Sequence, residues 1–91
     1  MEEFLKALNI NNEYTIDEKG SAVIDLNNSN DYVRMFNKLD KSDIVEEDIE
    51  VSQITLDASM VQYTSDEYPY RISLMADFKG DTYKMVISKD W

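Results

Sequence analysis

The stretch 70–87, YRISLMADFKGDTYKMVI, alternates apolar and polar residues on both sides of a glycine-containing turn. This alternation is typical of strands with one buried face. A two-residue turn at Gly80-Asp81, with a positive φ at Gly80, would join the two arms as an antiparallel hairpin and set Phe78 opposite Tyr83. We therefore predict a C-terminal hairpin whose apolar residues share one face: Tyr70, Ile72, Leu74, Ala76, Phe78, Tyr83, Met85 and Ile87.

Residues 13–26, EYTIDEKGSAVIDL, predict an earlier hairpin for which two registers compete. One register uses a two-residue loop at Lys19-Gly20. The other uses a three-residue loop, 18–20, with its glycine in the left-handed conformation, and sets Ile16 opposite Ala22. Register follows the buried face, so we favour the second, which gathers the apolar residues on one side: Tyr14, Ile16, Ala22, Ile24 and Leu26.

Two segments have the apolar spacing of amphipathic helices. Residues 2–10 predict a short helix with three apolar residues on one side: Phe4, Leu5 and Leu8. Residues 30–40 predict a longer helix with a single apolar stripe: Tyr32, Met35, Phe36 and Leu39. The polar loop before it, 27–30, offers side chains that cap a helix N-terminus.

The segment 49–64 predicts a long extended strand in which the parity of the apolar residues changes twice. A change of parity within one strand is what a bulge produces, so we predict bulges near Ser52-Gln53 and Met60-Val61. Residues 65–69, SDEYP, are expected to form a turn, because Pro69 cannot donate to a strand ladder.

These elements predict one α+β domain spanning residues 1–91, in the order α-β-β-α-β-β-β. Every consecutive pair of strands is joined by a hairpin except across the second helix. The expected architecture is an antiparallel sheet of about five strands with two short helices on one face.

Composition narrows the functional classes. The chain has no histidine and no cysteine, so zinc and copper sites, thiolate chemistry and a histidine-activated serine are not expected. The two glycines are taken up by turns, which leaves no phosphate-binding loop. We therefore expect no enzyme and no cofactor. The acidic N-terminus is unlike a signal peptide and no apolar run reaches the length of a membrane span, so a soluble, cytoplasmic protein is expected.

One stretch imitates the start of a calcium-binding EF-hand loop, at residues 25–36. Its sixth position is Asn30 where the loop needs glycine, and its twelfth is Phe36 where the loop needs a bidentate glutamate. We interpret the segment as a loop with a helix cap and predict no metal site.

Charge is the most marked property of the chain. Acidic residues number 19 and basic residues 9, a formal net charge of −10. Residues 40–50, DKSDIVEEDIE, hold six carboxylates and one lysine. If residues 46–50 are extended, alternate carboxylates project to one side about 6.6 Å apart and imitate a phosphate backbone. We call five residues the acidic row and predict that they contact a partner: Asp43, Glu46, Glu47, Asp48 and Glu50. Secondary contacts are expected from Asp66, Glu67 and Tyr68.

Small size, strong negative charge, absence of cysteine and a helix-plus-antiparallel-sheet plan together resemble a known group of proteins. These are the small acidic inhibitors encoded by phages and other mobile elements, including the uracil-DNA glycosylase inhibitor and anti-CRISPR proteins. Such inhibitors occupy the DNA site of a host enzyme. The resemblance implies inhibition by DNA mimicry; it includes no shared motif, and no residue role is carried over from it.

The leading hypothesis is an acidic interaction module that inhibits a basic nucleic-acid-binding protein, such as a CRISPR effector nuclease, by DNA mimicry. Counterion release from the partner's basic groove would drive binding. Direct contact with nucleic acid or anionic membranes is not expected, because the charges repel. The alternative is a structural or assembly subunit that associates through a sheet edge, for which segment 49–64 would serve. Alone, the chain is expected to be a monomer or a small homo-oligomer.

Overall fold

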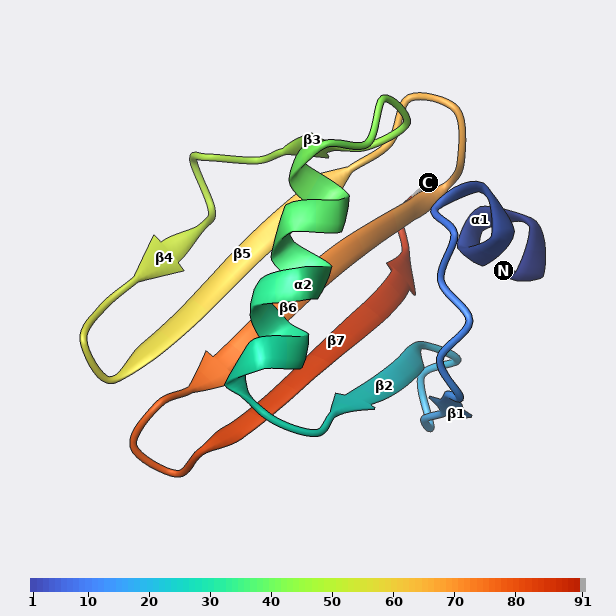
Figure 1. Ribbon diagram of the computed structural model, residues 1–91. Helices are drawn as coiled ribbons and strands as arrows, with labels where there is room; N and C mark the ends of the chain where they lie inside the picture. Colours follow the sequence, from blue (N-terminus) through green and yellow to red (C-terminus); the bar gives the residue numbers. More distant parts are fainter. Residues whose placement is uncertain (91) are drawn as a thin grey trace.

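The computed structural model describes residues 1–90 and shows a seven-stranded antiparallel sheet with its helices on one side (Figure 1). Strands lie in the order β1-β2-β7-β6-β5-β3, and β4 pairs with the same edge of β5 as β3 does. The elements are α1 (Glu2–Ala7), β1 (Thr15–Ile16), β2 (Ala22–Leu26), α2 (Ser29–Asp40), β3 (Glu46–Glu47), β4 (Gln53–Ile54), β5 (Ala58–Thr64), β6 (Tyr70–Asp77) and β7 (Thr82–Lys89).

The predicted α+β class with an antiparallel sheet is confirmed, but the strand count and order are wrong. The sheet has seven strands and the order is α-β-β-α-β-β-β-β-β. The difference arises between the second helix and residue 64, where one long strand was expected. The chain there instead makes two short edge strands, β3 and β4, before the full-length β5.

Three rows of side chains cross the four central strands and form the base of the core. In each row the residues are paired across β2, β7, β6 and β5 and are buried. The rows are Ala22-Ile87-Ile72-Tyr63, Ile24-Met85-Leu74-Val61 and Leu26-Tyr83-Ala76-Ser59. Cross-strand neighbours on one face are the contacts that stabilise a sheet, and here they also build a continuous apolar floor for the helices.

Helix α2 lies across this floor, as Figure 1 shows. Of its predicted apolar stripe, Tyr32, Met35 and Leu39 are buried. Phe36 is partly buried. Asn28 caps the helix, accepting a 2.9 Å hydrogen bond from the Asp31 backbone N–H. The stretch 25–36 is thus a strand end, a helix cap and a helix, as the loop-and-cap interpretation expects.

Helix α1 is shorter than predicted and ends at Ala7. Asn9 follows in the left-handed conformation, with φ of 58°, which turns the chain away. The helix buries Phe4 completely, and the ring stacks on Tyr70 with centroids 5.2 Å apart. The N-terminal helix therefore joins the same core, at the start of β6.

The favoured register of the first hairpin is confirmed. Ile16 pairs with Ala22, and Gly20 has a φ of +82°. The prediction that the whole apolar set is buried is wrong at Ile16, whose side chain is exposed. The reason is position: β1 is a two-residue strand at the margin of the sheet, whereas β2 pairs with the central strand β7 and contacts α2.

The strands of the C-terminal hairpin have the predicted face but not the predicted register, and the prediction is wrong at Phe78, which lies in the loop and is exposed. Tyr83 pairs with Ala76 rather than with Phe78, a shift of two residues that leaves a four-residue loop. Gly80 donates its N–H to Asp77 Oδ1 at 3.0 Å, and the positive φ falls on Asp81, at 52°. A two-residue shift keeps every side chain on its face, so the apolar pattern alone does not distinguish the two registers.

The predicted bulges in segment 49–64 are not there. At Met60-Val61, β5 pairs with β6 over seven consecutive residues without interruption. The first change in the parity of the apolar residues corresponds to a turn at 49–51, just before Ser52-Gln53. The second arises because the segment contains a hairpin, which joins β4 to β5. A turn changes which positions face the core, as a bulge does, so the apolar pattern alone does not distinguish a turn from a bulge.

The two glycines allow a paired test of the loops. A Cβ on Gly80 would lie 2.7 Å from Asp77 Oδ2 and displace the carboxylate that holds the turn, whereas a Cβ on Gly20 meets nothing within 4 Å. We expect Gly80→Ala to lower the free energy of unfolding by about 1 kcal/mol, the usual worth of such a hydrogen bond. In an Asp77→Ala background, the same change should cost nothing further.

Gly20→Ala is the matched control, because its cost comes only from backbone strain at positive φ, about 1–2 kcal/mol. That cost should be the same with and without Asp77→Ala. Urea unfolding of the five variants measures both cycles. Equal penalties for Gly80→Ala in the two backgrounds would show that the Asp77 contact does not hold the turn.

Candidate functional site: an acidic edge of the sheet

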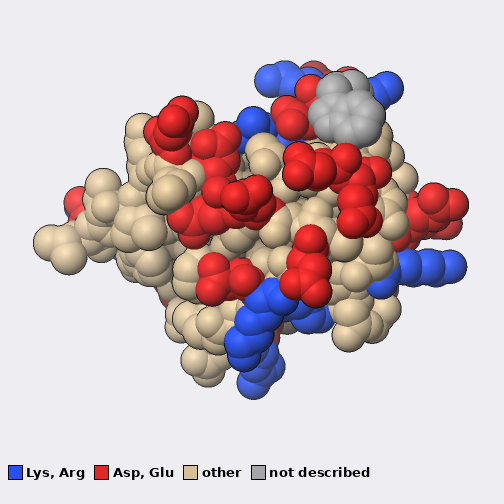
Figure 2. All heavy atoms as spheres, turned by 90° about the horizontal axis from the view of Figure 1, so that it is seen from above, with Lys and Arg blue, Asp and Glu red and all other residues tan. Residues whose placement is uncertain are grey.

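The acidic residues are concentrated in one continuous part of the chain. Between Lys41 and Arg71 there is no lysine or arginine, but there are eight carboxylates: Asp43, Glu46, Glu47, Asp48, Glu50, Asp57, Asp66 and Glu67. This part of the chain makes the outer edge of the sheet, β3 to β5, and the loop that joins β5 to β6. Figure 2 views the molecule from the β3 side and shows acidic side chains gathered over it.

Strand pairing brings the two predicted contact segments together. Glu46 pairs with Thr64 at the end of β5, directly before the β5–β6 loop. Four exposed carboxylates from the two segments line one small groove of about 120 Å³, which has Ile44, Val45 and Thr64 in its walls. We call its four carboxylates the acidic edge: Asp43, Glu46, Asp66 and Glu67.

Glu47 points to the other side of β3. It pairs with Tyr63, a buried residue of the core, and is partly buried. The Tyr63 hydroxyl has no hydrogen-bond partner among residues 1–90. Burial, together with the nearby Glu47 and Asp40 carboxylates, raises its pKa well above the usual range. Glu47 therefore adds negative potential beneath the surface and has less access to a partner than Glu46.

Asp48 is tied to the sheet by Arg71. The Arg71 guanidinium donates to Asp48 Oδ2 at 3.1 Å, to Gln62 Oε1 at 2.8 Å and to Asp90 Oδ1 at 3.2 Å. The hydrogen bond to Asp48 is the main reason that the pKa of Arg71 is raised. The charge of Asp48 is thus balanced within the chain, on the sheet face opposite α2.

Glu50 and Tyr68 complete the predicted set. Glu50 is exposed in the turn 49–51, which leaves the sheet edge, so the regular row expected for residues 46–50 ends after Asp48. Tyr68 is partly buried, and its ring packs on Phe4 with centroids 5.2 Å apart. Its larger role is to anchor the β5–β6 loop to α1, which holds Asp66 and Glu67 in place.

Sequence reasoning missed Arg71 as the residue that ties Asp48 to the sheet. A signal was present, because Arg71 is the only basic residue between Lys41 and Lys79. A single cation in so acidic a region is a natural candidate for an internal ion pair. Its partners, however, come from β5, the β3–β4 turn and the C-terminus, and only the sheet topology brings them together.

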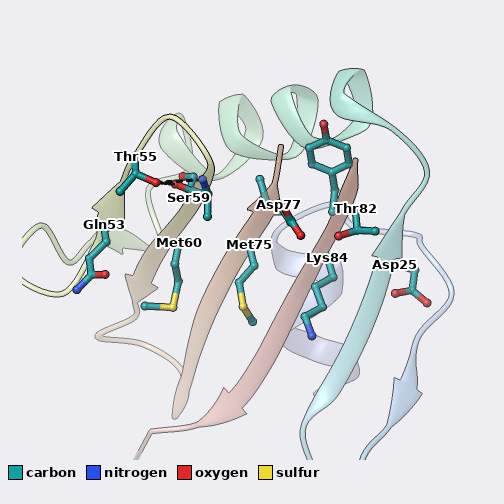
Figure 3. Close-up of a pocket in the computed structure, with 12 residues that line it drawn as sticks. Asp25, Gln53, Thr55, Ser59, Met60, Met75, Asp77, Thr82 and Lys84 are labelled. Atoms are coloured by element: carbon teal, nitrogen blue, oxygen red, sulfur yellow. Dashed lines mark hydrogen bonds between the residues drawn. The ribbon is translucent and has the colours of Figure 1, made fainter. Parts of the chain in front are cut away.

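A larger hollow lies on the sheet face that α2 does not cover, with a volume of about 500 Å³ (Figure 3). Met60 and Met75 form its floor, and both point away from the helix in the close-up. Lys84 lies between Met75 and Asp25, each its cross-strand neighbour.

Among the described residues, no group of three or more potential ligands has the arrangement of a metal site.

Comparisons with protein-family models, with curated proteins and with solved structures found no match. Within residues 1–90, no helix has the length and apolar character that crossing a membrane requires.

The Arg71 cluster predicts a salt-dependent contribution to stability. Arg71→Met keeps the aliphatic stem but removes the charge, so we expect it to lower the free energy of unfolding by about 1 kcal/mol at low salt. Arg34→Met is the matched control: it makes the same change in net charge, but within residues 1–90 Arg34 pairs only with Asp31, at 3.4 Å on the exposed side of α2. Its cost should stay within about 0.5 kcal/mol.

Both variants are compared by urea unfolding at low and high salt, and the difference between them should shrink as salt screens the charges. If the two arginines contribute equally at low salt, the Arg71 cluster does not stabilise the fold beyond an ordinary exposed ion pair.

Proposed function

We propose that this protein inhibits a nucleic-acid-binding protein, such as a CRISPR effector nuclease, by presenting its acidic edge to the site that DNA would occupy. The observation that carries the proposal is the pairing of β3 with the end of β5. This pairing brings the carboxylates of two separate segments together around one groove. Both segments lie between Lys41 and Arg71, where the sequence has no lysine or arginine.

The chemistry of such a surface fits a site built for phosphates. A DNA-binding groove presents lysine and arginine side chains and releases counterions when it binds, which gives steeply salt-dependent affinity. Carboxylates held on a sheet edge offer the same charge without the flexibility of a disordered acidic tail. A preordered surface loses less conformational entropy on binding.

Fixed geometry supports this role over that of a solubilising charge. Asp66 and Glu67 follow Ser65, whose hydroxyl accepts hydrogen bonds from the Glu67 and Tyr68 amides at 3.2 Å. On the other side of the groove, Glu46 lies within the β3 ladder. The carboxylates thus extend from ordered backbone on both walls.

Association through a sheet edge is the less favoured function. The two margins of the sheet consist of two-residue strands, β1 on one side and β3 and β4 on the other. The turn 49–51 interrupts the longer margin, with Asp48 directly before it and Glu50 within it. Short, interrupted and charged edges are the features by which proteins prevent strand addition.

Charge reversal tests the proposal. In the double variant Glu46→Lys and Glu67→Lys, one carboxylate on each wall of the groove is reversed. We expect inhibition of DNA cleavage by a sensitive effector nuclease to weaken by orders of magnitude, and the salt dependence of binding to fall by roughly one unit of slope for each lost contact. The measurement is inhibition across a panel of purified, guide-loaded CRISPR effector nucleases at two salt concentrations.

Glu13→Lys with Glu18→Lys is the matched control, since both residues are exposed, lie at or before the first hairpin loop and give the same change in net charge. The control should inhibit as the native chain does. Equal loss in both double variants, or inhibition of no member of the panel by the native chain, would overturn the proposal.

A further inference from the structure

Four large apolar side chains are exposed within one short segment of the edge beyond the acidic groove. They belong to the β3–β4 turn, β4 and the hairpin tip, and are here called the apolar arm: Ile49, Val51, Ile54 and Leu56. Their exposed fractions range from 41% for Val51 to 97% for Leu56. They account for four of the seven exposed large hydrophobic residues in the described chain, within eight consecutive positions.

The backbone of the arm is held in place, so these side chains are presented by ordered structure. At the tip, the Thr55 N–H and hydroxyl both donate to the Ala58 carbonyl at 2.8 Å, and the Phe78 N–H donates to the Asp57 carbonyl at 2.9 Å. At the other end, the Ser52 hydroxyl donates to the Asp48 carbonyl and accepts from the Gln62 N–H. Leu56 is therefore fixed at the end of a hairpin that projects from the sheet (Figure 1).

Charge indicates what covers the arm. Glu50 and Asp57 alternate with its apolar residues, and the adjoining β6–β7 loop adds Asp77 and Asp81 against a single cation, Lys79. A second copy of the chain would bring like charges together, on a protein already at −10. A partner with basic residues around an apolar pocket would satisfy both the side chains and the carboxylates.

We propose that the apolar arm is a second docking element, which inserts Ile54 and Leu56 into an apolar pocket with a basic rim on the same partner that binds the acidic edge. This inference rests on the proposed function. β3 pairs at Thr64 and β4 at Ser59, five positions apart along β5. At about 3.3 Å per residue, the backbones of the two elements lie about 17 Å apart along β5, so the partner contacts both from the edge of the sheet.

The two elements divide the work of binding. Charge on the acidic edge accelerates encounter and sets the salt dependence, whereas burial of the arm slows dissociation. Figure 2 shows the largely uncharged projection at the left, on the side where Figure 1 places β4, beside the acidic surface. The arm also gives specificity that charge alone does not supply, because a basic groove without an adjacent pocket leaves the apolar side chains in water.

Two synthetic peptides of equal length and charge test the proposal at low salt. One is an amphipathic helix with leucines on one side and lysines around them, and the other replaces the leucines with serines. We expect the native chain to bind the leucine peptide at least roughly tenfold more tightly than the serine peptide, because burying a leucine side chain gives an effect of this size.

The double variant Ile54→Ser and Leu56→Ser should lose this preference while binding the serine peptide unchanged. The matched control, Ile16→Ser with Val33→Ser, removes two exposed apolar residues elsewhere and should keep it. A preference retained in the arm variant overturns the inference. So does a native dimer that the arm variant converts to a monomer in analytical ultracentrifugation, since the occupant would then be a second copy.

The same titrations distinguish this result from failure of the proposed function. Binding of the serine peptide reports the acidic edge alone, and it should weaken in the Glu46→Lys and Glu67→Lys variant. Suppose that this variant binds the serine peptide as the native chain does, while the preference for the leucine peptide still depends on the arm. The acidic edge is then not the charged contact, and the inference about the apolar arm holds without the proposed function.

Discussion

The cross-strand row Ile24-Met85-Leu74-Val61 is the contact on which the other parts of the structure depend. It joins β2, β7, β6 and β5 through side chains that are almost completely buried. Each such side chain contributes about 1.5–3 kcal/mol through burial, whereas two exposed charges 4 Å apart in water interact by only about 1 kcal/mol. Burial of one core side chain therefore stabilises the fold by more than one exposed pair of like charges destabilises it, on a surface that carries most of the 19 acidic residues.

The same row fixes the direction of every residue on the outer edge. Because Val61 and Tyr63 face the core, their neighbour Gln62 faces outward, where it and Asp48 share Arg71. Pairing of Glu46 with Thr64 then places the acidic segment beside the β5–β6 loop. The geometry of the acidic edge is thus a consequence of strand register in the core.

The sequence predicted the elements that the core needs and was less informative about the edge. Register in the first hairpin followed from apolar side chains that fit only one alignment. In the second hairpin the register differs by two residues from the predicted one, in a loop where Asp77 accepts a hydrogen bond from Gly80, and this shift leaves the apolar pattern unchanged. Ile54 and Leu56 alternate like core residues, but α2 does not extend over them and they remain exposed.

The acidic residues of the candidate site were likewise visible in the sequence, but their convergence was not. It requires a two-residue strand, β3, which is too short to leave a periodic signal. The internal pairing of Asp48 with Arg71 joins residues 23 positions apart and is set by the same topology. Composition identified the kind of surface, and tertiary structure determined which carboxylates are available to a partner.

Mutual exclusion between this protein and DNA tests the central claim most directly. An effector nuclease that the protein inhibits would be titrated with it at a series of fixed DNA duplex concentrations. If the acidic edge occupies the DNA site, the apparent Kd of the protein rises in proportion to the concentration of DNA and no ternary complex forms. An apparent Kd that reaches a plateau, with all three components in one complex, would contradict the account.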